Sequence, residues 1–391
     1  MNIIFVSMRS TVSYLGGAEI LTQVIAESLV LLGHRVVIYT AGFGGRRCIN
    51  GVYIQETPLL SFPMKFRTTL LPLYSVLLEV FFGRLKDFIA ADVVHAIDSD
   101  AIILMSNWKF LQNKFVATIQ DYTLIWPTKD YFLKDLGTSH THKIIYSLVA
   151  AIRIKVKLRA VSKLRYAVCV SRFIAKEVNK VNSRMQLAII GNCISPFWQQ
   201  IKKLIIRDID ILYVGKLMPY KGVDILLHAI FLLSKTHRCN AVIVGEGLSN
   251  RYVRLAKKLG IEDCVTFTGP VAYAQIQGYY LRSKVVVSPS IWPEPCGRSI
   301  IEAMWNGCAV VATNVGGTPE SLTDYSHGRL VAPNDSHAIA KACSTLLKQG
   351  KIRERYGKKA AQFAHKHYSS ERIAIEYNRF YTLIKSNRLL L

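Results

Sequence analysis

Acidic residues are scarce in this chain, which has 26 Asp and Glu against 50 Lys and Arg among its 391 residues. The formal net charge of +24 points to an anionic partner, such as a membrane surface, a nucleic acid or an acidic substrate. A nucleic acid is the weakest of these candidates, because no recognisable nucleic-acid-binding module accompanies the charge. The hydrophobic fraction of 51% is typical of a globular protein and argues against disorder.

Cysteine pairs with metal-ligand spacing are also missing. The eight cysteines include no Cys-x-x-Cys sequence, and most of them stand in apolar runs. This pattern argues against a zinc site or a disulfide framework, and it is typical of reduced core cysteines in a cytosolic protein. The sequence contains no other metal-ligand spacing, internal repeat or low-complexity tract.

A hydrophobic run long enough to cross a membrane is absent. The most apolar stretch, Thr69–Phe82, is too short to span a bilayer and contains Pro72 and Glu79. The N-terminus lacks the basic region of a signal peptide, and Met1–Ser7 is typical of a first β-strand. The sequence therefore predicts a cytoplasmic protein without a transmembrane helix.

Strand and helix signals alternate along most of the chain, whose length allows two domains of typical size. This alternation predicts an α/β protein with two doubly wound parallel sheets. Residues 335–388 are expected to form three helices without strands, and the polar segment Trp198–Asp210 is the expected linker. The expected strands lie near residues 2–7, 35–40, 52–57, 93–97, 115–120, 167–171 and 186–191, and then near 210–215, 241–245, 265–268, 285–289, 309–313 and 329–331.

Two carboxylates flank the segment Glu294-Pro-Cys-Gly-Arg-Ser-Ile-Ile-Glu302, which follows the expected strand Val285–Ser290. Apolar residues recur at helical spacing after Gly297, so Glu294 is expected in a loop and Glu302 in the following helix. Backbone amides at that helix start can bind a phosphate, and Glu302 can accept hydrogen bonds from a ribose or sugar diol. By spacing alone, a solvated loop acid and a helix acid paired with a lysine fit equally well.

Residues 285–322 resemble the donor-site segment of the retaining glycosyltransferases of family 4, which have the GT-B fold. In that family the segment reads Glu-Pro-x-Gly-x-x-x-x-Glu-Ala-Met and is followed by a Gly-Gly-x-x-Glu turn, here Gly316-Gly-Thr-Pro-Glu320. Ile211–Gly222 resembles a second family element, Val-Gly-Arg/Lys-Leu with a later Lys-Gly. Its two basic residues clamp the donor diphosphate, and they correspond to Lys216 and Lys221. Without the resemblance, both would be ordinary lysines beside a helix.

The resemblance also implies the domain organisation. Two Rossmann-like, doubly wound parallel-sheet domains are expected to face each other across a cleft. Residues 1–200 would form the acceptor-binding domain and residues 201–369 the nucleotide-sugar-binding domain. The last helix, in residues 370–391, would cross back to the N-terminal domain. Ligands of such sheets lie beyond the carboxyl ends of the strands.

In the N-terminal domain, Gly16-Gly-Ala-Glu19 looks like the family's Gly-Gly-x-Glu loop under the donor phosphates, although it could simply be a turn into a helix. The chain departs from the family at Gln120, where many relatives have a histidine that contacts the donor sugar. Glutamine can form hydrogen bonds but cannot take up a proton near neutral pH. Asp121 is expected to contact a sugar hydroxyl or to position the acceptor. His95 is a candidate substitute for the histidine, but a packed histidine at a strand end is the commoner situation.

The resemblance implies a set of site residues. The expected catalytic residues are Glu294, Lys216, Lys221, Gln120 and Asp121. The expected donor-binding residues are Gly16, Gly17, Gly215, Lys216, Lys221, Gly269, Val271, Glu294, Cys296, Gly297, Arg298, Ser299 and Glu302.

The implied activity is the transfer of a sugar, with retention of anomeric configuration, from a nucleoside diphosphate sugar to a hydroxyl acceptor. The donor is expected to be UDP- or GDP-linked, and no further cofactor or metal is expected. The expected acceptor is a lipid-linked or polysaccharide precursor at the cytosolic face of the membrane. One alternative is a non-catalytic basic protein that binds membranes or polyanions on the same fold. A weaker alternative is a sugar-nucleotide epimerase, which would lack this combination of two lysines and two glutamates.

Basic residues are concentrated between Lys143 and Arg172, and no Asp or Glu occurs from Leu136 to Lys176. The centre, Ile152–Arg159, alternates apolar and basic residues, which would normally indicate a strand. Gly and Pro are absent from residues 138–190 and the family has helices here, so we expect a helix. The expected membrane contacts are Arg153, Lys155, Lys157 and Arg159, on a surface beside residues 70–82. A solvated basic face without a ligand is the alternative.

Overall fold

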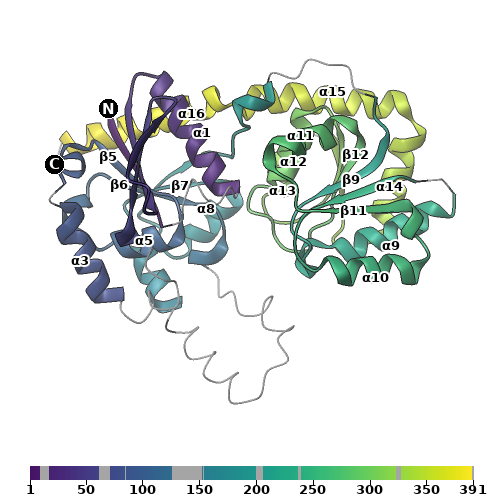
Figure 1. The fold of residues 1–391 in the computed structure, drawn as a ribbon, viewed down its shortest axis with the longest axis horizontal. Helices are drawn as coiled ribbons and strands as arrows, with labels where there is room; N and C mark the ends of the chain where they lie inside the picture. The colour runs from purple at the N-terminus through teal and green to yellow at the C-terminus, as the bar shows by residue number, and fades with distance from the viewer. Residues whose placement is uncertain are drawn as a thin grey trace, which may run out of the picture. The chain divides into compact units, whose positions relative to one another are not determined.

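The computed structural model describes residues 1–8, 17–60, 71–83, 85–125, 152, 154–199, 206–236, 239–322 and 327–389. These residues form two units (Figure 1). Unit 1 contains Met1–Ser195 together with Ser370–Leu391, and unit 2 contains Pro196–Ser369. The division lies a few residues before the boundary at 200/201 that the sequence suggested. The C-terminal helix α16 (Ser370–Leu389) is part of unit 1, although helix α15, which precedes it, is part of unit 2.

Unit 1 is built on an eight-stranded sheet with the strand order β3-β4-β2-β1-β5-β6-β7-β8. All neighbouring strands are parallel except β3 and β4. The central strands are runs of buried Val, Ile and Ala, as expected for strands that are covered on both faces. The strands are β1 (Asn2–Ser7), β2 (Arg35–Ala41), β3 (Arg46–Ile49), β4 (Val52–Thr57), β5 (Val93–Ala96), β6 (Phe115–Ile119), β7 (Tyr166–Cys169) and β8 (Gln186–Ile189).

Strand β3 is an addition to the strands that were expected from the sequence. It pairs with β4 in an antiparallel hairpin whose turn is Asn50-Gly51. Both turn residues have positive φ, 49° and 80°, which is the conformation of a two-residue type I′ turn. The Asn-Gly dipeptide is a strong local hairpin signal, so this strand was open to prediction from the sequence.

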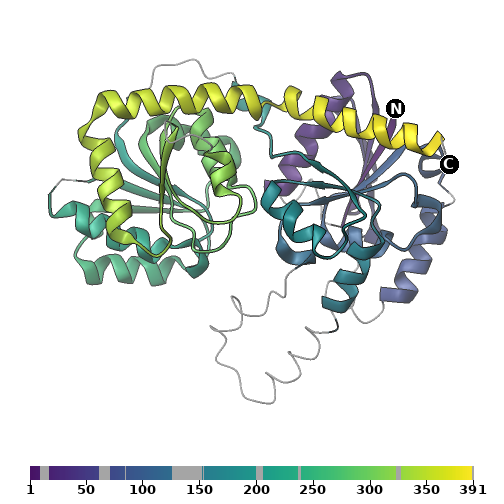
Figure 2. The same ribbon diagram turned by 180° about the vertical axis from the view of Figure 1, so that it is seen from behind.

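Helices cover both faces of the unit 1 sheet. On one face α1 and α16 lie side by side, and Ile373, Tyr377 and Tyr381 of α16 pack into the core there (Figure 1, Figure 2). Their spacing of about one helical turn explains why this face of α16 is buried. Residues 154–163 are helical, which confirms the helix expected for the basic segment. The named helices are α1 (Gly17–Leu31), α3 (Leu71–Gly83), α4 (Lys86–Ala90), α5 (Ser99–Met105), α8 (Arg172–Asn179) and α16, with 3-10 turns η1 (Pro58–Leu60), η2 (Lys109–Leu111) and η3 (Tyr122–Leu124).

Unit 2 contains a six-stranded sheet, with every neighbouring pair parallel. Its strand order is β11-β10-β9-β12-β13-β14. Numbered within the unit, this is the order 3-2-1-4-5-6 of the Rossmann fold, whose ligands bind where the order reverses. That point lies between β9 and β12. The strands are β9 (Ile209–Val214), β10 (Ala241–Val244), β11 (Val265–Gly269), β12 (Ser283–Ser288), β13 (Ala309–Thr313) and β14 (Gly328–Val331).

The helices of unit 2 form a layer on each face of its sheet. Helices α9, α10 and α14 pack on one face through the core around Leu226, Tyr252 and Ile339. Helices α11, α12 and α15 lie on the other face, and α12 packs along α15 (Figure 1). The helices are α9 (Val223–Ser234), α10 (Ser249–Leu259), α11 (Tyr273–Arg282), α12 (Arg298–Trp305), α13 (Thr318–Ser321), α14 (Ser336–Lys348) and α15 (Gly350–His367), with 3-10 turns η4 (Pro196–Gln199), η5 (Pro219–Lys221) and η6 (Glu262–Cys264).

Candidate functional site

Lys221 and Glu294 meet at the point where the strand order of unit 2 reverses. Lys221 is the last residue of η5, which follows β9, and Glu294 lies in the loop after β12. The Nζ atom of Lys221 lies 2.6 Å from Oε1 of Glu294, and the two side chains are 25% and 11% exposed. A lysine and a glutamate far apart in the sequence therefore form one partly exposed charged pair at the position where such sheets bind ligands.

Backbone contacts between the two loops bring this pair together. The carbonyl of Tyr220 accepts hydrogen bonds from the amides of Ile291 and Trp292, each at 3.1 Å. Gly222 has a φ of 70°, and a Cβ atom at this position would lie 2.0 Å from the carbonyl oxygen of Pro289. Only glycine allows this approach, because any side chain would separate the two loops.

Glu294 is held from its other sides as well. Its Oε1 atom also accepts a hydrogen bond from the Ser290 hydroxyl. Its backbone carbonyl accepts one from the amide of Gly317 at 2.6 Å. A Cβ atom at Gly316, whose φ is 56°, would lie 2.5 Å from that carbonyl oxygen. The Gly-Gly-x-x-Glu turn thus holds the backbone of Glu294 in place. The hydrogen bond from Ser290 could not be predicted from the spacing of the motif.

Lys216 follows Gly215 directly after β9, and its side chain is exposed. Its backbone is firmly placed: the Tyr213 hydroxyl donates to the Lys216 carbonyl at 2.8 Å, and the Gly215 amide donates to the carbonyl of Val244 at 3.0 Å. No ion pair of Lys216 occurs within the described residues. Its side chain is exposed, while the Gly215 hydrogen bond ties the start of its loop to β10.

The loop expected to border the nucleotide base follows β11. Gly269 has a φ of 70°, and its carbonyl accepts a hydrogen bond from the Gly245 amide at 3.1 Å. Val271 comes two residues later, and both residues are partly exposed. The loops after β9, β10 and β11 are thus joined to one another by backbone hydrogen bonds.

Helix α12 begins immediately after this cluster of loops. Gly297 is its N-cap, with a φ of 58°, and its carbonyl accepts the amides of Ile300 and Ile301. The first turn of a helix leaves amide groups without partners inside the helix, which makes it a seat for an anion. Ser299 in this turn is partly exposed, whereas Cys296 is only 5% exposed and can present little more than its backbone.

Glu302 lies one turn further along α12 and is only 5% exposed. Its Oε1 atom accepts a hydrogen bond from Nε of Arg298 at 2.9 Å, and its Oε2 atom accepts one from the Tyr280 hydroxyl at 2.9 Å. Burial raises the pKa of Glu302, while Arg298 and Tyr280 act in the opposite direction. The sequence suggested either a structural ion pair or a ribose-binding carboxylate at this position. Glu302 does pair with a basic residue, and it also lies one turn from the expected phosphate-binding amides.

The expected residues of the N-terminal domain belong to unit 1. Gly16 lies outside the described residues, and Gly17 is the first residue of α1. Gln120 follows β6 and is partly exposed. Asp121 is exposed, and its carboxylate accepts a hydrogen bond from the Thr123 amide at 2.8 Å as the N-cap of η3. Asp121 therefore has a structural task besides any contact with a substrate.

His95 is a core residue of unit 1. Its side chain is fully buried, with Nδ1 bonded to the Tyr381 hydroxyl and Nε2 at 2.6 Å from the Thr118 hydroxyl. Burial lowers its pKa to about 3. The imidazole is therefore neutral and inaccessible, so His95 is no substitute for the histidine that is replaced by Gln120.

Asp98 is a residue of this region that the sequence interpretation missed. The order of the unit 1 sheet reverses between β1 and β5, and Asp98 follows β5 at that point. Its carboxylate accepts hydrogen bonds from the Met8 amide at 2.7 Å, the Ser7 hydroxyl at 2.9 Å and the Ala101 amide at 2.9 Å. Burial raises its pKa. The only sequence signal was an acid just after a buried strand, which is too common to single out a residue.

Within the described ranges, no three His, Cys, Asp or Glu side chains are grouped as metal ligands. Most of the cysteines are buried, and burial raises the pKa of Cys169 and Cys239 to about 12. These thiols remain protonated and pack as small apolar groups.

Two family models together match almost the whole chain. The model for "Glycosyltransferase Family 4" matches residues 15–196, and the model for "Glycosyl transferases group 1" matches residues 196–363. An uncharacterised glycosyltransferase of Methanocaldococcus jannaschii is 28% identical over 402 residues, which cover 98% of each chain.

Solved structures share the fold over nearly their whole length. Sucrose-phosphate synthase from Thermosynechococcus elongatus superposes with a TM-score of 0.75 at 19% identity, over 98% of this chain and 99% of the other. HepE of Anabaena in complex with UDP-glucose superposes with a TM-score of 0.68 at 19% identity, over 100% of this chain and 99% of the other.

Proposed function

Because the chain belongs to the group 1, family 4 glycosyltransferases and has their GT-B fold, we propose that it transfers a sugar from a nucleoside diphosphate sugar to a hydroxyl acceptor with retention of configuration. The observation that carries this proposal is the Lys221–Glu294 pair, 2.6 Å apart at the reversal of strand order in unit 2. At this position the Lys221 ammonium group, which can bind a diphosphate, lies directly beside the Glu294 carboxylate, which can accept hydrogen bonds from sugar hydroxyls.

The donor binds to unit 2 in this proposal. Lys216, Lys221 and the amides of the first turn of α12 hold the diphosphate. An ammonium group has three N–H donors, so Lys221 can bond Glu294 and phosphate oxygens together. Glu294 keeps Oε2 for the hydroxyls of the donor sugar, and Glu302 accepts from the ribose. UDP is the first nucleotide to consider, because HepE of Anabaena is a structural neighbour in complex with UDP-glucose.

The charges that develop during sugar transfer explain why lysines are proposed at the diphosphate. When the bond between the sugar and the diphosphate breaks, the bonding electrons pass to the diphosphate and the sugar gains oxocarbenium character. Placed cations stabilise the departing anion. The acceptor hydroxyl then attacks the anomeric carbon on the face from which the diphosphate leaves, and its proton passes to a phosphate oxygen. This path needs no strong general base, so a glutamine at position 120 is compatible with activity.

Calorimetric titration with UDP, GDP, ADP and CMP tests the donor site. We expect one nucleotide to bind selectively, and Glu302→Ala to weaken that binding by roughly 1.5–3 kcal/mol, because a charged hydrogen-bond acceptor is lost. Thermal unfolding of both proteins shows whether the variant is folded. Binding of no nucleotide, followed by no turnover of any sugar nucleotide, would instead favour the non-catalytic alternative.

We further propose that unit 1 contacts an anionic membrane and takes its acceptor there. The helix at 154–163 carries exposed Lys155 and Arg159 and partly exposed Lys157. Helix α3 exposes Leu77, Val80 and Phe81 within two turns, and grouped apolar side chains on a surface mark an interaction site. In the part of the chain that the structure describes, no helix is both long and apolar enough to cross a membrane.

The helix at 154–163 and helix α3 both contact the short segment 107–109. The Lys109 amide donates to Glu79 of α3 at 3.1 Å, and the Lys163 ammonium donates to Asn107. The basic helix and the exposed apolar residues therefore adjoin the same loop, which suits a surface that binds lipid headgroups and inserts apolar side chains. Arg153, the fourth expected membrane residue, lies outside the described residues.

Vesicle co-sedimentation tests the membrane contact. Changing Lys155, Lys157 and Arg159 to alanine should weaken binding to phosphatidylserine-containing vesicles roughly hundredfold, at about 1 kcal/mol for each cation. The matched control changes Arg355, Lys358 and Lys359, three exposed cations of α15 in unit 2. Equal losses in both triple variants would mean that the overall charge, and no defined surface, attracts the vesicles.

A further inference from the structure

Glu302 is part of a hydrogen-bonded group that extends well beyond the expected donor site. Among the described residues, the charged or titratable groups facing its carboxylate are Arg298 on its own helix and Tyr273 and Tyr280 on α11. The main-chain carbonyl of Glu302 accepts a hydrogen bond from the Asn306 side chain at 2.8 Å. Both ends of the residue are therefore held, the carboxylate by Arg298 and Tyr280 and the backbone by Asn306.

Arg298 is itself fixed by aromatic residues. Its guanidinium carbon lies 5.0 Å from the centre of the Tyr273 ring, a distance typical of a cation–π contact. Tyr273 stacks on Trp198, with ring centres 5.1 Å apart and an angle of 19° between the planes. Only 21% of the Arg298 side chain is exposed. A side chain bound on one face and at Nε has little freedom to reorient.

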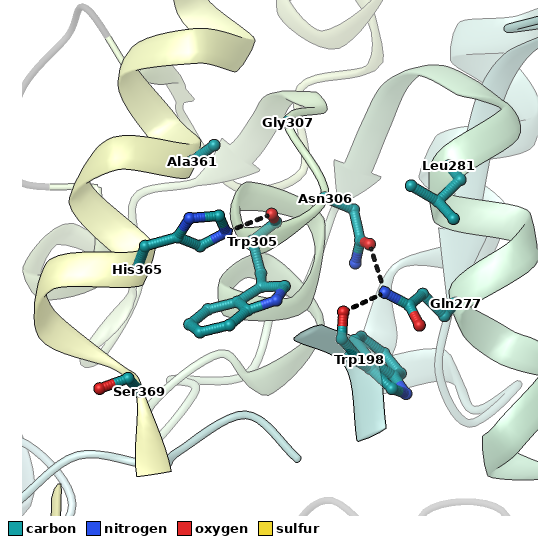
Figure 3. A pocket seen from close by; sticks show the side chains of 9 residues that line it. All are labelled: Trp198, Gln277, Leu281, Trp305, Asn306, Gly307, Ala361, His365 and Ser369. Atoms are coloured by element: carbon teal, nitrogen blue, oxygen red, sulfur yellow. Dashed lines mark hydrogen bonds between the residues drawn. The ribbon is translucent and has the colours of Figure 1, made fainter. Parts of the chain in front are cut away.

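The other end of this stack lines a pocket of about 560 Å³ on the side of α12 near its C-terminus. Figure 3 shows Gln277 of α11 between Trp198 and Asn306. The Gln277 amide donates to the Trp198 carbonyl at 2.8 Å and to Oδ1 of Asn306 at 3.1 Å. Contacts therefore run from Arg298 through Tyr273, Trp198 and Gln277 to Asn306, whose side chain donates to the Glu302 carbonyl.

The contacts of the Arg298 side chain separate its task from that of the lysines. Its partner Glu302 lies four residues later in α12, about 6 Å further along the helix axis. Its contacts with Glu302 and with the Tyr273 ring tie the guanidinium to these two side chains, whereas the diphosphate is assigned to the backbone amides after Gly297. Lys216 and Lys221, by contrast, come from the loop after β9.

We propose that Arg298 is a positioning residue that holds the Glu302 carboxylate in place and in its anionic form for the donor ribose, and that it does not bind the diphosphate itself. This inference rests on the proposed donor site. Its physical basis is that a buried carboxylate without a cationic partner takes up a proton more readily. An anionic carboxylate forms stronger, charge-assisted hydrogen bonds with a diol than the neutral acid does.

Titrations between about pH 6 and about pH 9 test the inference. The probe is UDP-glucose, whose diphosphate does not titrate in this range, or GDP-mannose or ADP-glucose where the wild type prefers that base. For Arg298→Met we expect roughly tenfold weaker binding near neutral pH. Its affinity should rise with pH, because the pKa of Glu302 lies higher than in the wild type and the carboxylate ionises only at higher pH. Arg298→Lys should restore the pH profile, and Glu302→Gln should bind independently of pH.

A double variant separates positioning from direct contact, and it removes both charges so that neither is left buried alone. If Arg298 acts through Glu302, Arg298→Met with Glu302→Gln should bind the probe as tightly as Glu302→Gln does, within about twofold. Much weaker binding by the double variant would mean that Arg298 contacts the donor directly, and the inference would be wrong. The inference would also be wrong if the binding of the probe by Arg298→Met had the same pH dependence as binding by the wild type. A wild type that binds none of the three sugar nucleotides would instead overturn the proposed function, and this inference with it.

Discussion

Replacement of Lys221 by Met is expected to lower the turnover of the sugar nucleotide roughly 100- to 1,000-fold. Lys221 forms an ion pair with Glu294, with its Nζ atom 2.6 Å from the carboxylate, at the proposed position of the leaving diphosphate. Its charge matters most in the transition state, when negative charge collects on the diphosphate, so kcat should fall more than KM rises. Release of nucleoside diphosphate, followed over a range of donor concentrations up to saturation, measures both kcat and KM.

Lys235→Met is the matched control for this experiment. Lys235 is exposed just after α9, and its ammonium group lies 4.4 Å from the centre of the Phe231 ring. The substitution changes the charge and side chain in the same way, in the same unit, but away from the charged pair. We expect wild-type turnover from it. A Lys221→Met enzyme that releases nucleoside diphosphate at the wild-type rate would remove Lys221 from the catalytic set.

Replacement of Gly222 by Ala is expected to have the largest effect on stability. The left-handed backbone at this residue, with φ of 70°, disfavours any side chain by roughly 1–2 kcal/mol. The new Cβ atom would also lie 2.0 Å from the Pro289 carbonyl oxygen, so the loops after β9 and β12 must move apart. We expect a further cost of roughly 1–3 kcal/mol from this overpacking. Urea unfolding of the variant, followed by circular dichroism, measures the total.

Gly260→Ala separates the two parts of that effect. Gly260 has nearly the same backbone conformation, with φ of 66°, but no atom lies within 4 Å of a Cβ atom built there. This variant should show the backbone cost alone. Because Gly222→Ala also displaces Lys221 from Glu294, it should weaken nucleotide binding, whereas Gly260→Ala should not. Equal stabilities and affinities for the two variants would contradict the proposed role of the close approach at Gly222.

Much of the fold could be predicted from the sequence because its signals are local. Runs of Val and Ile between helical segments indicated two parallel sheets, and each of the expected strands has a counterpart in the structure. The basic segment was harder, since its alternating pattern suggested a strand and only the lack of Gly and Pro and the family resemblance favoured the helix that the structure has at residues 154–163. Strand β3 was not predicted, although the Asn50-Gly51 dipeptide is a local sequence signal for its hairpin.

The partners of the site residues could not be predicted in the same way. Nothing in the motif spacing indicates that Ser290 donates to Glu294, or that the Tyr280 hydroxyl donates to Glu302. The Tyr280 contact depends on which helix faces align when α11 and α12 pack on the same face of the sheet. Only the Arg298–Glu302 pair, four residues apart in one helix, has a local signal. His95 shows that the general expectation can hold, because a packed histidine at a strand end was the commoner situation and the packing of α16 buries it completely.

The sequence by itself determined the family, the two α/β units and the residue types at the proposed donor site, because motifs and hydrophobic patterns are written in neighbouring residues. Only the tertiary structure decided which of these residues meet. Lys221 and Glu294 are 73 positions apart, and they form a pair because β9 and β12 are adjacent parallel strands whose carboxyl ends reach the same edge of the sheet. A glycine at position 222, which admits the Pro289 carbonyl where a side chain would stand, then lets the two loops come close enough for the charges to touch.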